Sequence, residues 1–143
     1  MTQDTVKLLR ECDAGVKTAV NSIDEILSDI KSEDLRRIMD DSRLKHQSLG
    51  DEIHAELSSV DEKGKDPSPI SRVMSWMKIN WKMTEKPSDA TIAELMYDGC
   101  SMGVKSLAKY LNEYKCADGS SKAHARQLIE IEDSLMSDLR TFM

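Results

Sequence analysis

The stretch that decides the fold is ELMYDGCSMGVKSLAKYLNEY, residues 94–114. Read at the 3.6-residue period of an α-helix, its inner face carries large residues at both ends and small ones in the middle. Glycine in a helix interior costs about 1 kcal/mol relative to alanine, so two glycines four residues apart need a packing reason. We expect another helix, or a bound molecule, to come unusually near this face, which should be formed by Gly99, Met102, Gly103, Tyr110 and Tyr114.

The composition favours helix over sheet and a single domain over residues 1–143. The chain has 143 residues, 32% of them charged, and only two Trp, three Tyr and one Phe. Residues that favour strands are therefore few. Lys and Arg total 20 against 26 Asp and Glu, and the two signs are interspersed. Because no basic stripe is available for a phosphate backbone, the sequence predicts no binding of nucleic acid.

Hydropathy and cysteine usage indicate a cytoplasmic protein. No apolar run approaches the roughly 18 residues that a membrane-spanning helix needs. The cysteines, Cys12, Cys100 and Cys116, are odd in number, far apart and without CxxC spacing. They are therefore expected to be reduced thiols, which agrees with a reducing compartment.

Three further segments show apolar residues at helical spacing. They predict helices over residues 5–30, 33–60 and 121–142, in addition to the opening stretch. Ser32 and Ser88 are suitable N-caps for the second and third helices. Short loops between helices one and two, and between three and four, predict two antiparallel hairpins.

Residues 61–88 interrupt this pattern with glycine and three prolines. A structureless connection of this length is unusual in a compact domain, so we expect residues 70–83 to form a short helix within a packed crossover. The alternative is an amphipathic segment on a membrane surface, because two Trp and several Lys lie there, but the packed crossover is favoured. A long crossover makes helices two and three parallel, which predicts an all-α, ferritin-like four-helix bundle.

The metal-binding motif of ferritin-like bundles is not intact in this chain. Such bundles use a Glu from each of two helices and Glu-x-x-His from each of the other two. The residue three positions before His46 is Arg43, and the one before His124 is Ser121. The carboxylate three residues before His54 falls on the far side of its helix.

A sparse polar layer remains inside the expected bundle. Its members are Asp13, His46 and Glu132, with Cys100 at the edge. The layer has two interpretations: a degenerate or mononuclear metal site, and a structural His–carboxylate pair that keeps buried polar groups satisfied. The second interpretation is favoured, and no cofactor is expected. Gly99 and Gly103 lie within a helix rather than in a phosphate-binding loop, and Cys100 has no clear base beside it.

Three blocks of the sequence resemble a known group of proteins. They are MSWMKINWKM, IAELMYDGCSMGVKSLAKYLNEY and ARQLIEIEDSLMSDLRTFM, and the likeness is most specific at GCSMG, residues 99–103, and at NEY, residues 112–114. The chain resembles an uncharacterised Firmicutes family of small ferritin-like four-helix-bundle proteins of unknown function. The resemblance implies the fold and a bacterial cytosolic setting, and it carries over no activity and no catalytic residue.

The sequence thus leaves three hypotheses for function. The favoured one is a non-catalytic helical bundle that acts by association, with a second copy of itself or with another protein. The second is a metal- or redox-linked bundle that uses Asp13, His46, Glu132 and Cys100. The third is a binder of a small ligand over Gly99 and Gly103.

Overall fold

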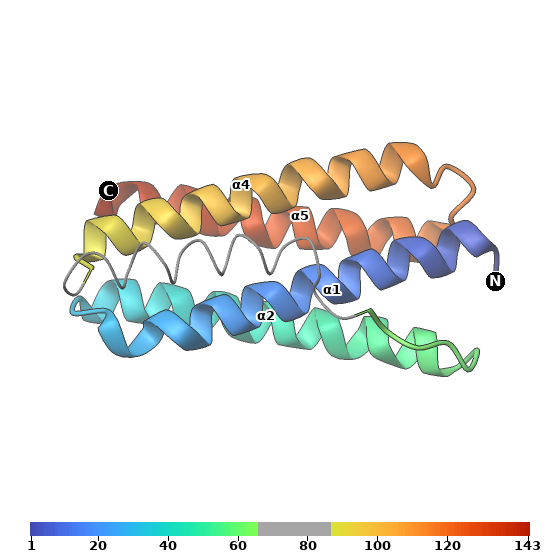
Figure 1. Cartoon of the computed structure of the whole chain (residues 1–143), viewed down its shortest axis with the longest axis horizontal. Coiled ribbons are helices and arrows are strands. Elements are labelled where there is room, and N and C mark those ends of the chain that lie inside the picture. Colours follow the sequence, from blue (N-terminus) through green and yellow to red (C-terminus); the bar gives the residue numbers. More distant parts are fainter. Residues whose placement is uncertain (66–86) are drawn as a thin grey trace.

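The computed structural model describes residues 1–65 and 87–143, which form an all-α four-helix bundle (Figure 1). Its elements are α1 (Gln3–Ile26), η1 (Leu27–Asp29), α2 (Glu33–Ser58), α4 (Asp89–Glu113), α5 (Gly119–Leu139) and η2 (Arg140–Phe142). The helix expected over residues 70–83, as packed crossover or as membrane-surface segment, lies outside the described residues. Within the described ranges, no helix has the length and apolar character needed to cross a membrane.

Each of the four long helices begins at a side chain that caps it. Thr2, Ser32, Ser88 and Asp118 each accept a hydrogen bond from the backbone N–H three residues further on. The predicted caps Ser32 and Ser88 are confirmed. The first helix is shorter than expected, because its α-helical part ends at Ile26 and the chain passes through a 3-10 turn to an extended residue, Ile30.

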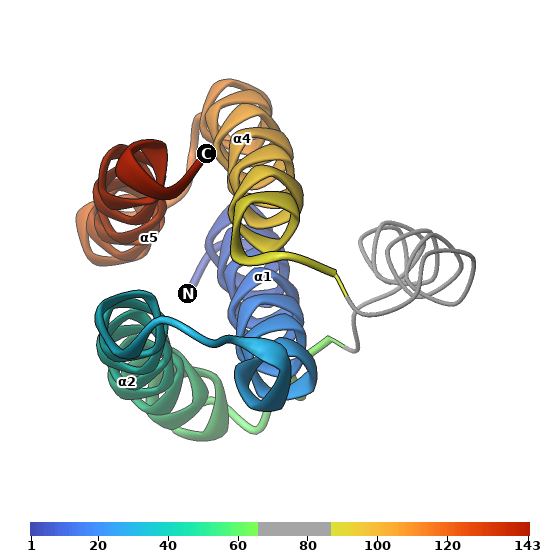
Figure 2. The same cartoon turned by 90° about the vertical axis from the view of Figure 1, so that its left-hand side faces the viewer.

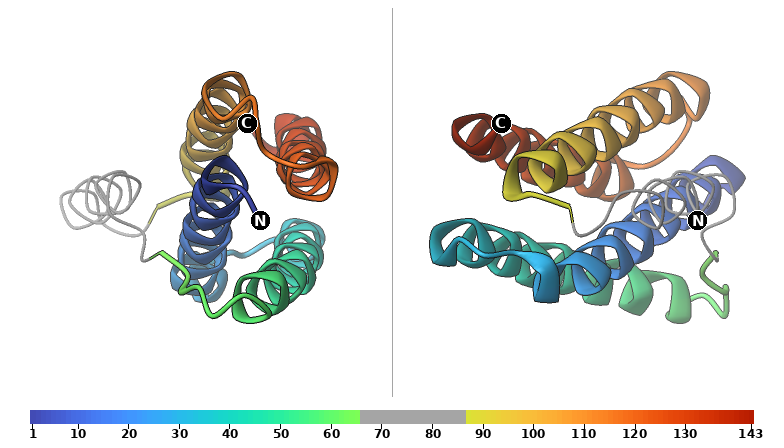
Figure 3. Two further views of the ribbon diagram at one scale, coloured as in Figure 1. Left: turned by 90° about the vertical axis from the view of Figure 1, so that its right-hand side faces the viewer. Right: turned by 60° about the vertical axis from the view of Figure 1, so that its left-hand side comes forward.

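Two pairs of helices run in opposite directions. In Figure 1, α2 and α4 both begin at the left end of the bundle, whereas α1 and α5 begin at the right end. The parallel course of α2 and α4 agrees with the topology expected from the sequence. Viewed end-on, α1 and α4 lie on one side and α2 and α5 on the other (Figures 2 and 3), and α1 contacts all three of the other helices.

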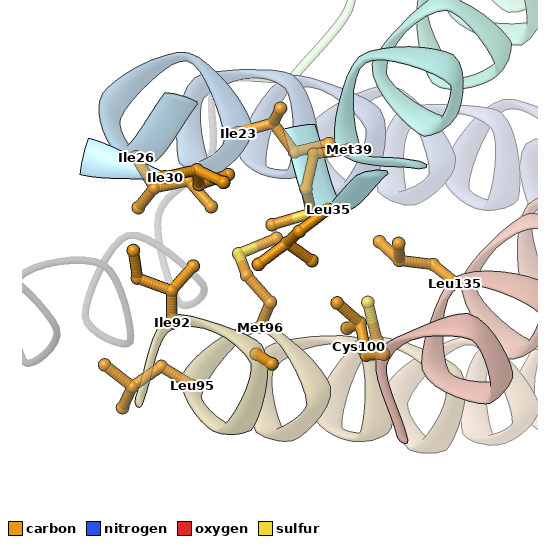
Figure 4. Close-up of a cluster of buried hydrophobic side chains, with 12 residues drawn as sticks. Ile23, Ile26, Ile30, Leu35, Met39, Ile92, Leu95, Met96, Cys100 and Leu135 are labelled. Atoms are coloured by element: carbon orange, nitrogen blue, oxygen red, sulfur yellow. The ribbon is translucent and has the colours of Figure 1, made fainter. Parts of the chain in front are cut away.

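The buried apolar residues form two clusters, one toward each end of the bundle. Figure 4 shows the first, in which Leu35, Met96 and Leu135 converge from three different helices. The second contains Leu9, Cys12, Leu49, Ile53, Leu57, Leu107 and Leu128, among others. The fully buried His46 belongs to neither cluster, and neither does Glu132. Along α2, His46 lies between Met39 of the first cluster and Leu49 of the second, and along α5 Glu132 lies between Leu128 and Leu135, so the two polar residues separate the clusters.

One close contact between helices was not found from the sequence. It lies between α1 and α2, where a Cβ atom added to Gly50 would be 2.7 Å from Val16 Cγ1. That separation is shorter than carbon–carbon contacts allow, so glycine at this position permits the two helices to approach. The expectation that the residues 94–114 helix would hold the tightest helix contact is therefore incomplete.

Candidate functional site

The centre of the bundle holds His46 of α2 and Glu132 of α5. His46 is 0% exposed and Glu132 is 6% exposed. The Nε2 atom of His46 lies 3.8 Å from Oε1 of Glu132. At this distance the imidazole and the carboxyl group are neighbours, but the separation is too long for a direct hydrogen bond. We refer to these two residues as the His46–Glu132 pair.

The hydrogen bond at the other side of the His46 ring fixes its tautomer. Nδ1 lies 2.8 Å from the backbone carbonyl oxygen of Ser42, which can only accept a hydrogen bond. Nδ1 therefore carries a proton, and Nε2 of the neutral ring is an acceptor that faces Glu132. The pair then needs one further proton, on either Nε2 or the carboxyl group, for one of the two side chains to be a hydrogen-bond donor and the other an acceptor. Burial raises the pKa of Glu132, and this effect outweighs the opposing influence of the neighbouring His46.

Two polar atoms of this pair are left without partners. Among the described residues, neither Nε2 of His46 nor Oε2 of Glu132 makes a hydrogen bond, although both atoms are buried. Buried polar atoms in folded proteins nearly always have a partner, which can be a water molecule or a ligand. The unpartnered acceptor on Glu132 is the feature on which the functional argument depends.

Gly103 and Gly99 have different surroundings, although they are one helical turn apart on α4. A Cβ atom at Gly103 would lie 2.5 Å from Oε2 of Glu132, so the close neighbour is a carboxylate from α5 rather than a helix backbone. Among the described residues, a Cβ atom at Gly99 would meet nothing within 4 Å. Of the two expected causes, another helix or a bound molecule, no described helix comes close at Gly99. Met102 was also misplaced, because it is 51% exposed and lies away from the inner face.

Asp13 is buried but belongs to a different set of interactions. Its Oδ2 atom lies 2.8 Å from Nζ of Lys17 and accepts a hydrogen bond of 2.9 Å from the backbone N–H of Lys65. Gly64 is needed there, because a Cβ atom would clash with the same oxygen. Asp13 therefore fixes the segment after α2 onto α1, rather than serving His46.

The four candidate metal ligands do not gather into one site. Within the part of the chain that the structure describes, no three His, Cys, Asp or Glu side chains are placed to hold a metal ion. The His46–Glu132 pair supplies two metal-ligating side chains, whereas protein metal sites generally use three or more. The buried thiols are unsuited to nucleophilic or redox chemistry, because burial and nearby carboxylates raise the pKa of Cys12 to about 12 and that of Cys100 further.

A cavity of about 50 Å³ lies between α1 and α4. Small side chains on both helices leave this space open, and the carboxyl group of Glu132 borders it from α5. We call it the α1–α4 pocket; the described residues that line it are Glu11, Gly15, Thr18, Ala19, Ser22, Met96, Gly99, Cys100, Gly103, Ser106, Leu107, Tyr110 and Glu132.

Sequence reasoning identified only part of this lining. Gly99, Gly103 and Tyr110 were expected at such a face and do line the pocket, whereas Tyr114 stacks on Tyr110 at a centroid distance of 6.1 Å and lies outside it. The contribution of α1 was missed. Its signal was a row of small residues at helical spacing that begins at Gly15 and continues through Ala19.

Replacing Gly99 with alanine should raise the free energy of unfolding by about 0.5–1 kcal/mol, because the helix gains propensity and the added methyl group meets no neighbour. Urea unfolding followed by circular dichroism would measure the change. Gly103→Ala is the matched control, and it should show a smaller gain or a loss, since the buried Glu132 carboxyl group would have to move. Equal gains at both positions would show that this carboxyl group is not held against α4.

Comparison of the chain with protein-family models, with curated proteins and with solved structures finds no match. The resemblance to the Firmicutes family therefore has no supporting match, and what is established is a four-helix all-α architecture.

Proposed function

We propose that the protein binds a small ligand in the α1–α4 pocket. The observation that carries this proposal is an open cavity lined in part by Glu132, a buried carboxylate whose Oε2 atom has no hydrogen-bond partner among the described residues. An apolar cavity without polar groups would simply be a packing defect. A cavity that also presents a hydrogen-bond acceptor in a low-dielectric setting offers both space and orientation to a guest.

The glycines of α4 support this proposal. Glycine at 99 costs the helix about 1 kcal/mol relative to alanine, and no neighbour within 4 Å among residues 1–65 and 87–143 requires its small size. Close helix packing therefore does not account for this residue. The need to keep the pocket open accounts for the glycine, because any larger side chain at position 99 would take up part of the cavity.

The other hypotheses stay open as proposals of lesser support. The large apolar side chains exposed among the described residues come from separate parts of the chain: Met1, Leu44, Val60, Met102 and Met143. Association with a second copy or a partner is supported less, because these side chains are scattered along the described sequence. The ferritin-like assignment is supported by the parallel course of α2 and α4 (Figure 1). A metal-linked role has less support, because the described residues place no group of three metal-ligating side chains around His46.

Titration of the full-length, isotope-labelled protein with 1-propanol should test the proposal. Saturable chemical-shift changes are expected at backbone amides that line the α1–α4 pocket, such as those of Ala19 and Gly99. Gly99→Leu should abolish these changes, because its Cβ is sterically allowed and the rest of the side chain fills the cavity. Ala108→Leu, at an exposed position of the same helix, is the control and should leave them intact.

Two results would overturn this proposal. One is a set of shifts spread over the surface that Gly99→Leu does not alter. The other is a crystal structure in which residues 66–86 of the chain itself fill the pocket.

A further inference from the structure

We propose that the ligand of the α1–α4 pocket is a compact alkylammonium ion, with its ammonium group against Glu132 and its apolar part between α1 and α4. This inference rests on the proposed function and adds the chemical class of the ligand. It follows from three properties of the lining: the sign of its charge, its hydrogen-bonding groups and its size.

The charge that lacks compensation at this pocket is negative. Two carboxylates line it, Glu11 and Glu132, and no Lys, Arg or His is found among the described lining residues. Glu11 is already paired with the ammonium group of Lys65 at the surface. Among the described residues, the basic side chain beside Glu132 is His46, which supplies a positive charge only when Nε2 is protonated. A cationic ligand would therefore neutralise the one buried carboxylate that has no permanent partner.

The hydrogen-bonding groups that line the pocket favour a ligand that donates hydrogen bonds. Oε2 of Glu132 is an unused acceptor. The hydroxyl group of Thr18, which also lines the pocket, donates to the carbonyl oxygen of Ala14 at 2.9 Å and so presents its oxygen as an acceptor. An ammonium group carries three donors and suits this arrangement, whereas a carboxylate ligand would meet acceptors. A bare metal ion would need more coordinating side chains than the His46–Glu132 pair provides.

The size of the pocket limits the ligand to a few atoms. One water needs about 10–15 Å³ of cavity in this measure, so a 50 Å³ cavity holds roughly four atoms of that size. Propylammonium has this size, and its carbon chain would lie against small residues such as Gly15, Ala19 and Gly99. We therefore choose it as the probe.

The experiment compares three probes of equal size on the full-length protein at neutral pH and constant ionic strength. Propylammonium, 1-propanol and propionate differ only in the charge and hydrogen bonding of the head group. From amide chemical shifts, propylammonium should bind at least about tenfold more tightly than 1-propanol, the usual advantage of a charge-assisted hydrogen bond. Propionate should not bind in the pocket.

Substitutions then assign the preference to one carboxylate. Glu132→Gln keeps the shape of the side chain and removes its charge, and it should bring propylammonium to within about twofold of 1-propanol. Glu130→Gln makes the same chemical change at an exposed position of α5 and should leave the preference intact. Gly99→Leu, which leaves Glu132 in place, should block both probes.

The outcomes separate the two proposals. If 1-propanol binds in the pocket and propylammonium binds no more tightly, the inference about ligand class is wrong and the proposed function stands. If propylammonium binds equally well to Glu132→Gln, it is held by the acidic surface and the inference is also wrong. If neither probe shifts the lining amides, both proposals fail.

Discussion

Replacing His46 with alanine should lower the free energy of unfolding by about 3–5 kcal/mol. The imidazole ring is fully buried between α2 and α5, so its removal leaves a cavity that the surrounding side chains can fill only in part. It also removes the imidazole that lies beside Oε1 of Glu132, and among the described residues the carboxyl group would then be buried without a basic neighbour. Urea unfolding followed by far-ultraviolet circular dichroism would measure the loss.

A matched set of variants shows whether the loss comes from the pair. His54→Ala removes the same side chain from an exposed position of α2 and should change stability by less than about 0.5 kcal/mol. The double variant His46→Leu with Glu132→Leu should recover most of the loss, because well-packed apolar residues commonly match or exceed a buried ionic pair in stability. If His46→Ala is as mild as His54→Ala, or if the double variant is as unstable as the sum of its single changes, the pair does not act as a unit.

The sequence predicted the bundle because its information is mostly local. The 3.6-residue period places four helices, and Ser32 and Ser88 mark two of their starts by capping chemistry. The fourth helix begins at Gly119 after its cap Asp118, two residues earlier than expected. These signals require no knowledge of how the helices meet.

The contents of the interior depend on register between helices, which local patterns do not determine. His46 and Glu132 could be matched in height because a hairpin topology fixes the order of levels along the bundle. Asp13 could not be assigned, since its partner Lys65 comes from an irregular segment that docks onto α1. Met102 was misplaced because one position corresponds to 100° on a helix, enough to move it from the inner face beside Gly103 to the solvent.

The glycines show the same limit. A glycine on a buried face indicates that something needs room, but it does not say what. At Gly103 the neighbour is a carboxylate, at Gly99 it is open space, and at Gly50 it is a side chain of another helix. Three different physical causes therefore produce one sequence signal, and only the third is helix packing in the sense that the sequence first suggested.

Replacing Gly50 with leucine should lower the free energy of unfolding by about 3 kcal/mol, at the upper end of the range for overpacked interiors. Even the Cβ atom would lie 2.7 Å from Val16 Cγ1. Valine in a helix is confined largely to one rotamer, so Val16 cannot turn aside and α1 must move away from α2. Ser48→Leu adds the same side chain at an exposed position of α2 and should be nearly neutral in a urea unfolding experiment.

A double-mutant cycle identifies the contact responsible. Gly50→Ala introduces only the clashing methyl group, and Val16→Ala removes the methyl groups that it would strike. The double variant should therefore be more stable than the sum of the single changes predicts, by about 1 kcal/mol. Simple additivity would show that the two helices are further apart at this level than the Val16–Gly50 contact requires, and that the glycine has another cause. Recovery on removal of Val16 would establish that the contact between Val16 and position 50 limits how closely α1 and α2 approach at this level.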